Sequence, residues 1–219
     1  VMCLIVISAV LNTLIEILAR RSFFGTVAYI IENPFITAYN CIIVLFTLSV
    51  ALYFSKRYSV LTIVCFAWIV LGVINSVLMG IRGTPLSAVD FTILKSAYAL
   101  ISLYISVPFL LALILAAAAA IAAIVFLFIK VPKVKPTYIK AILLTILSAF
   151  MIFFTSEKLL TSETVSASEK DISKTYSKYG FACCFSYSLI GHGINTPDSY
   201  SKESIDKILT SINYAEKYK

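Results

Sequence analysis

Charged residues are scarce in this chain. Asp, Glu, Lys and Arg make up 13% of the 219 residues, whereas hydrophobic residues make up 60% and the mean hydropathy is +0.96. Soluble domains usually contain about 25% charged and 45–50% apolar residues. The composition therefore excludes an ordinary soluble domain and indicates a membrane protein.

Motifs for catalysis or metal binding are also lacking. The single histidine, His192, lies between Gly191 and Gly193, so no histidine-based metal cluster is available. The five cysteines show no CxxC spacing, and the sequence contains no Gly-rich phosphate loop, HExxH motif or nucleophile elbow. We therefore expect no catalytic residues, cofactor or metal in this chain.

The net charge of +7 is unevenly distributed. From Ser156 onward eight lysines are matched by eight acidic residues, whereas the first 155 residues contain ten basic residues against Glu16, Glu32 and Asp90. Basic residues that flank apolar runs are typical of membrane proteins, where they set the orientation. This distribution argues against nucleic acid as a partner.

Five apolar runs divide residues 1–155. About 20 apolar residues at 1.5 Å each cross a hydrocarbon core of roughly 30 Å. We therefore predict an all-α membrane protein whose transmembrane domain (1–155) has five membrane-spanning helices. The runs are Val1–Leu18, Phe35–Phe54, Val60–Met79, Tyr104–Ile129 and Tyr138–Thr155.

Shorter segments between and after these runs predict amphipathic helices. Residues 21–33 and 92–103 have helical spacing of apolar positions and are expected to lie in the membrane interface. Residues 156–219 are expected to be a linker that contains amphipathic helices. Within it, Tyr179–Ile190 is too short to span and is predicted to return to the membrane surface. A helix from Ser201 has an apolar face with nothing to bury it, so we expect a further domain beyond Lys219.

The short loops predict the orientation. The loops at Lys56-Arg57 and 130–136 are more basic than the other two, which also contain Glu32 and Asp90. The positive-inside rule then gives a cytoplasmic N-terminus and an extracellular C-terminal tail.

Polar residues of three predicted helices fall on the same side of the membrane as a charged turn, Arg82–Asp90. We take these residues as candidates for binding a lipid headgroup, because ionisable or polar groups at membrane depth usually face a partner or a cavity. The candidates are Arg82, Thr84 and Asp90 in the turn, with Glu16, Asn40 and Asn75 below it.

The turn itself has a helix-start pattern. Thr84-Pro85 fits an N-cap followed by proline, and Ser87 with Asp90 fits a capping-box spacing. Helix N-terminal amides beside an arginine would bind a phosphate. The alternative is a capped connector in which Arg82 pairs with Asp90 or Glu16. Likewise, Glu16 and its neighbour Arg20 either form an ion pair at a helix end or face the interior of the bundle.

Several motifs resemble the membrane domain of the lipoteichoic acid synthase family of bacterial phosphoglycerol transferases. The resemblance extends over essentially the whole chain and is specific at the Arg-Gly-Thr-Pro-Leu motif. The matching residues are Ile15-Glu16 with Arg20, Asn33-Pro34 with Asn40, Arg82-Gly83-Thr84-Pro85-Leu86 with Asp90, Gly180-Phe181, and Pro197 with Tyr200-Ser201.

This resemblance implies a membrane anchor and lipid-facing domain in the bacterial cell membrane, followed by an extracellular sulfatase-like catalytic domain. That domain would hold a threonine nucleophile and a divalent metal, Mn or Mg, and would take phosphoglycerol from phosphatidylglycerol for a cell-envelope polymer. Phosphoethanolamine is a related possible headgroup. Two other interpretations of the residues stay open, namely a lipid transporter or flippase-like bundle that acts alone, and a scaffold that recruits cell-wall proteins.

Overall fold

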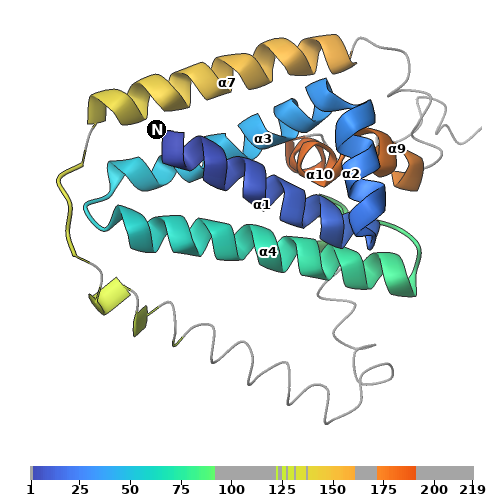
Figure 1. The fold of residues 1–219 in the computed structure, drawn as a ribbon, viewed down its shortest axis with the longest axis horizontal. Helices are drawn as coiled ribbons and strands as arrows, with labels where there is room; N and C mark the ends of the chain where they lie inside the picture. Colours follow the sequence, from blue (N-terminus) through green and yellow to red (C-terminus); the bar gives the residue numbers. More distant parts are fainter. Residues whose placement is uncertain are drawn as a thin grey trace, which may run out of the picture.

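The computed structural model describes most of residues 1–155 and part of the tail. The described residues are 2–91, 122, 125–126, 128–130, 132–136, 138–160 and 172–190, and they form helices and turns without any strand. Figure 1 shows the long helices side by side, with shorter helices gathered at one end. This part of the chain is therefore all-α, as predicted.

Four helices are long and apolar enough to cross a membrane. They are α1 (Met2–Arg20), α3 (Pro34–Ser49) with its 3-10 continuation η1 (Val50–Tyr53), α4 (Arg57–Ile81) and α7 (Tyr138–Leu160). Helix α3 packs between α1 and α7, and α1 packs on α4 (Figure 1). Four of the five predicted apolar runs are thus confirmed as helices of membrane-spanning length.

The other predicted segments fall largely outside the described residues. This applies to the run Tyr104–Ile129 apart from a few positions after residue 121, to the amphipathic segment 92–103, and to the helix from Ser201. These three remain predictions.

Polar contacts between the long helices supplement apolar packing. The Trp68 indole N–H of α4 donates to Thr47 Oγ1 of α3 at 2.9 Å. Ser49 and Tyr53 both contact Thr145 Oγ1 of α7, at 2.9 and 3.2 Å. Such bonds between helices are favoured where water does not compete for the same groups.

Helix α2 (Phe23–Glu32) confirms the predicted short helix between the first two spans. The Ser22 hydroxyl accepts the Gly25 N–H at 3.1 Å and caps its start. Tyr29 is buried, whereas several apolar side chains point away from the bundle and are exposed. These are Phe23, Phe24, Val27 and Ile31. The outward apolar face is what an interfacial helix needs, although the depth of α2 in a membrane stays a prediction.

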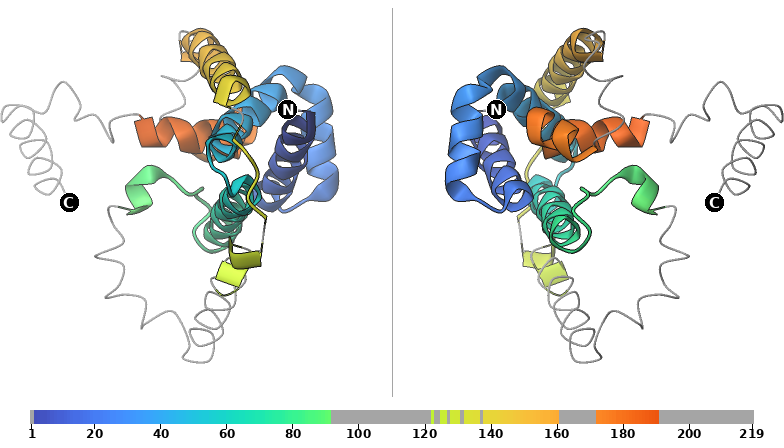
Figure 2. Two further views of the ribbon diagram at one scale, coloured as in Figure 1. Left: turned by 90° about the vertical axis from the view of Figure 1, so that its left-hand side faces the viewer. Right: turned by 90° about the vertical axis from the view of Figure 1, so that its right-hand side faces the viewer.

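The tail contributes two further helices, α9 (Ile172–Tyr179) and α10 (Phe181–Ile190). In Figure 2 they lie on the opposite side of α3 from α2. Helix α10 contacts α1 and α3, and its Phe181 and Ala182 are almost fully buried. The expectation that Tyr179–Ile190 returns to the membrane surface stays a prediction. The backbone of the segment finds polar partners on α1 and α3.

The two ends of the bundle differ. One end, here called the docking end, contains α2, α9, α10 and the segment 82–91 (Figure 1). The other, the basic end, contains the turn between η1 and α4 and the start of α7. Its basic residues are Lys56, Arg57, Lys130, Lys133, Lys135 and Lys140.

Candidate functional site at the docking end

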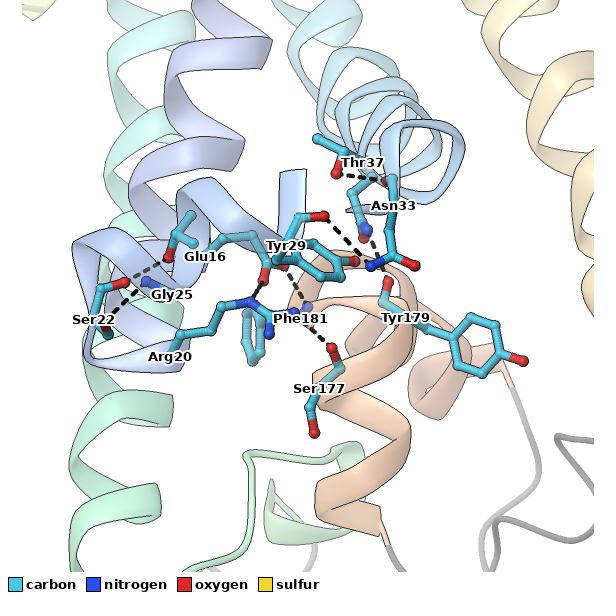
Figure 3. A network of polar contacts seen from close by, with 12 residues as sticks. Glu16, Arg20, Ser22, Gly25, Tyr29, Asn33, Thr37, Ser177, Tyr179 and Phe181 are labelled. Atoms are coloured by element: carbon cyan, nitrogen blue, oxygen red, sulfur yellow. Dashed lines mark hydrogen bonds and ion pairs between the residues drawn. The ribbon is translucent and has the colours of Figure 1, made fainter. Parts of the chain in front are cut away.

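Glu16 joins helix α1 to the start of α10. Its carboxylate is 1% exposed and accepts the Phe181 N–H at 2.8 Å on Oε1 and the Arg20 Nε–H at 3.2 Å on Oε2. Figure 3 shows these contacts. Both sequence interpretations of Glu16 are therefore correct, because it pairs with Arg20 and also points into the protein.

Arg20 extends the same network to α2 and α9. Its Nη2 donates to the Ser177 carbonyl at 2.7 Å, and its guanidinium carbon lies 3.6 Å from the centre of the Tyr29 ring. A guanidinium over an aromatic face is a favourable cation–π arrangement. Burial, with the nearby Glu16 charge, raises the pKa of the Tyr29 hydroxyl. Tyr29 therefore stays neutral here.

Asn40 of α3 binds the backbone on both sides of the α9–α10 junction. Its Nδ2 donates to the Tyr179 carbonyl at 2.8 Å, and its Oδ1 accepts the Cys183 N–H at 2.6 Å. Backbone groups at helix ends have no partner within the helix, and leaving them unpaired away from water is costly. Asn40 removes that cost for one carbonyl and one amide.

Gly180, between α9 and α10, is required by conformation and by space. Its φ of +83° is in the left-handed region, which favours glycine. A Cβ at this position would lie 2.6 Å from Asn40 Nδ2 and 2.7 Å from Glu16 Oε1. No residue with a side chain fits there without displacing the two polar groups that hold α10.

Asn75 of α4 plays the matching part for the segment 82–91. Its Oδ1 accepts the Leu86 N–H at 2.8 Å. The carbonyl of Leu86 accepts the Tyr176 hydroxyl at 2.8 Å, and the Ala88 N–H donates to Ser188 Oγ at 3.0 Å. The segment is thus held from α4 on one side and from α9 and α10 on the other.

Arg82 and Asp90 form the ion pair that one sequence interpretation predicted. Two guanidinium nitrogens lie 2.7 Å from the two carboxylate oxygens, and Asp90 also accepts the Ser87 N–H at 2.8 Å. Partial burial alone would raise the pKa of Asp90, but the bonds from Arg82 and Ser87 outweigh it and leave the pKa lowered. Arg82 also donates to the Pro85 carbonyl at 3.1 Å.

These contacts correct one expectation. The turn was predicted to expose helix N-terminal amides beside Arg82, but the amides of Leu86, Ser87 and Ala88 already donate to Asn75, Asp90 and Ser188. The amides at the start of this turn are therefore already paired within the protein. Whether the candidate residues also contact lipid remains a prediction. Arg82 and Thr84 keep exposed side chains, whereas Glu16, Asn40 and Asn75 are buried.

Aromatic side chains fill the space between the two polar clusters. The rings of Phe181 and Phe185 stack with centroids 5.4 Å apart, and Trp68 and Phe91 approach Phe185 edge-on at 6.5 and 6.3 Å. Offset and edge-to-face pairs of this kind favour packing beyond their buried area. Sequence reasoning did not assign these contacts, since they join residues from three different segments.

The described residues offer no group of three or more His, Cys, Asp and Glu side chains placed to hold a metal ion. Comparisons with protein-family models, with curated proteins and with solved structures find no match. The hydrogen bonds at the docking end fix the helix pair α9–α10 and the charged turn onto the bundle, and so position these segments.

Proposed function

We propose that this chain is the membrane domain of a phosphoglycerol transferase similar to the lipoteichoic acid synthase family. One observation favours this above the other interpretations. Residues that underlie the resemblance, although widely separated in sequence, meet in a single region: Glu16 and Asn40 hold the backbone around Gly180-Phe181, and Arg82 pairs with Asp90 nearby. Asn75 and Tyr176, which are not part of the motif set, hold Leu86 beside this pair. A shared motif set that forms one contact network is more specific than motif matches alone.

The proposal includes a fifth membrane span between residues 91 and 132. Residues 82–91 contact α9 and α10 at the docking end. Val134, in contrast, donates its N–H to the Ser55 carbonyl at 2.8 Å at the basic end. These two anchor points at opposite ends of the bundle support the proposed fifth span. The apolar run predicted at 104–129 is long enough for this.

The proposed orientation puts the basic end in the cytoplasm and the docking end outside the cell, in accordance with the positive-inside rule. In the transferase, the docking end would then anchor the chain that leads to an extracellular catalytic domain. The Arg82 side chain is 39% exposed and faces this side. It is the group that we expect to contact the phosphate of a phosphatidylglycerol headgroup.

The test uses the full-length protein in membranes that contain phosphatidylglycerol with a labelled glycerol headgroup. Transfer of phosphoglycerol to a polymer hydroxyl leaves diacylglycerol, so both labelled polymer and diacylglycerol should accumulate. We expect Arg82→Ala and Asp90→Ala each to lower this transfer about tenfold or more, as removal of a substrate-positioning contact does. Lys178→Ala, an exposed change on α9, is the matched control and should leave transfer unchanged.

Two results would contradict the proposal in different ways. If the well-folded wild type releases no diacylglycerol from phosphatidylglycerol, the assigned activity is wrong. If the wild type is active and both variants match it, the activity stands but the Arg82–Asp90 turn is only a connector. Protein amount and helicity, measured for each variant, separate loss of activity from loss of the fold.

A further inference from the structure

Within the described part of the chain, the basic end has no acidic residues to balance its charge. The chain contains no Asp or Glu between Glu32 and Asp90, and none between Asp90 and Glu157. All six basic residues of the basic end fall within these two acid-free stretches. Among the described side chains, the acidic groups Glu16, Glu32 and Asp90 belong to the segments that form the docking end.

Two segments distant in sequence combine to make the basic end. Lys56 donates its Nζ–H to the Phe128 carbonyl at 2.6 Å, and the same ammonium group lies 4.4 Å from the centre of the Phe128 ring. Val134 donates its N–H to the Ser55 carbonyl at 2.8 Å. These contacts fasten residues 128–136 to the turn between η1 and α4. The basic residues of both segments therefore form one surface.

This surface lies at the ends of three candidate membrane spans. Lys56 stands between two candidate spans, Pro34–Tyr53 and Arg57–Ile81, and Arg57 begins the second of them. Lys140 is in the first turn of the span that begins at Tyr138. Four of the lysines have exposed side chains, namely Lys130, Lys133, Lys135 and Lys140. Basic groups within a Debye length of an anionic lipid surface are each attracted to it by about 1 kcal/mol.

We propose that the basic end is a binding surface for anionic phospholipid headgroups of the adjacent leaflet. Lys130, Lys133 and Lys135 contact the lipid phosphates, and Lys56 positions their segment through Phe128. The surface recognises phosphate charge at the membrane–water boundary, so lipids with different anionic headgroups bind alike. This is separate from the proposed transferase substrate, which would bind at the opposite end of the bundle.

The experiment measures which lipids stay bound to the purified chain. The chain is held in mixed micelles with equal amounts of phosphatidylglycerol, phosphatidylserine and phosphatidylcholine of identical acyl chains, and bound lipids are counted by native mass spectrometry. We expect both anionic lipids to be retained at least about tenfold over phosphatidylcholine, since several lysines act together. In about 1 M salt, where the screening length falls to roughly 3 Å, this selectivity should be lost.

Variants then locate the surface. The triple change K130Q/K133Q/K135Q should bring retention of both anionic lipids close to that of phosphatidylcholine. The changes K130R/K133R/K135R, which keep the charge, should leave the selectivity intact. The matched control is K174Q/K178Q on α9, which removes two positive charges at the docking end and should have no effect.

Several results would overturn the proposal. These are equal retention of all three lipids by the wild type, unchanged selectivity in the triple glutamine variant, or an equal loss in the α9 control. Loss of phosphatidylglycerol alone, with phosphatidylserine retained, would also contradict it, because it would indicate a headgroup-specific site. If the triple variant does not reach the wild-type helicity, the salt dependence of the wild type still decides the question.

Discussion

The two ends of this bundle treat polar groups in opposite ways. At the docking end, the buried groups Glu16, Asn40 and Asn75 each bind a backbone amide of a segment from outside the long helices. At the basic end, Lys130, Lys133 and Lys135 are exposed and have no acidic residue near them in sequence. The buried polar residues at the docking end hold the protein together, whereas the exposed lysines at the basic end remain available to the surroundings.

The two ends differ because the docking end contains backbone groups that are buried and need a hydrogen-bond partner. A short helix pair placed beside membrane-spanning helices brings unpaired backbone groups away from water, and each has to find a partner. A tight turn that stays in water has no such requirement, so its side chains are free to carry charge. Three predictions test this contrast, from the largest expected effect to the smallest.

Gly180→Ala should have the largest effect, because it breaks the docking end. Two features disfavour a side chain at residue 180: the left-handed φ of +83°, and the 2.6 Å distance that would separate an added Cβ from Asn40 Nδ2. We expect about 2–5 kcal/mol of destabilisation and release of α10 from the bundle. Thermal unfolding in micelles and protease sensitivity near the α9–α10 junction measure these two effects.

Gly83→Ala is the matched control for Gly180. Gly83 also has a positive φ, +71°, but an added Cβ would meet nothing within 4 Å. Gly83→Ala should lower the free energy of unfolding only by the conformational penalty of about 1–2 kcal/mol. The α9–α10 junction should stay protected from protease. Equal costs at the two positions would show that the contacts of Gly180 with Asn40 and Glu16 are unimportant.

Asn75→Leu should have an intermediate effect. It removes the acceptor of the Leu86 N–H, and a buried amide left unpaired costs about 1–3 kcal/mol. Asn12→Leu on α1 is the comparison, because Asn12 is fully buried and neither of its amide atoms has a hydrogen-bond partner within the described part of the chain. The Cys41 thiol lies close to Asn12 but is a weak hydrogen-bonding group.

We expect Asn12→Leu to change the free energy of unfolding by less than about 1 kcal/mol, since it removes an unpaired polar group. The difference between the two variants, measured by denaturant titration in micelles, isolates the value of the Asn75 contact. If Asn12→Leu destabilises as much as Asn75→Leu, the contrast between paired and unpaired polar groups fails.

Acid should have the smallest effect, and only at the docking end. Folding lowers the pKa of Asp90 from its ordinary 3.8, since the bonds from Arg82 and Ser87 outweigh the desolvation that would raise it. The stabilisation is therefore present above pH 3.8 and is lost as the pH falls through the lower folded-state value. Because the pair is partly exposed, it contributes up to about 1 kcal/mol.

The measurement compares the wild type with Asp90→Asn. The wild type should be more stable near neutral pH, and the difference should shrink toward zero as the pH falls below 3.8. K133Q, at the basic end, should show the same small difference from the wild type at every pH in this range, because the change removes no carboxylate. A pH-independent difference for Asp90→Asn would rule out the ion pair as its source.

Much of the architecture could be predicted from local sequence. Hydropathy predicted α1, α3, α4 and α7 as helices of membrane-spanning length, because about 20 apolar residues in a row have few alternatives. Helical spacing predicted α2. The proximity of Arg82 and Asp90 in the sequence suggested their ion pair, with Glu16 as the alternative partner of Arg82.

The sequence by itself determined which residues are polar in an apolar chain, and so indicated that Glu16, Asn40 and Asn75 matter. Only the tertiary structure decided what they bind. Glu16 meets an amide 165 positions away and Asn40 a carbonyl 139 positions away, so no periodicity or spacing contains that information. Glu16 and Asn40 are observed to hold α9 and α10, because the backbone of these helices needs partners wherever it lies out of reach of water.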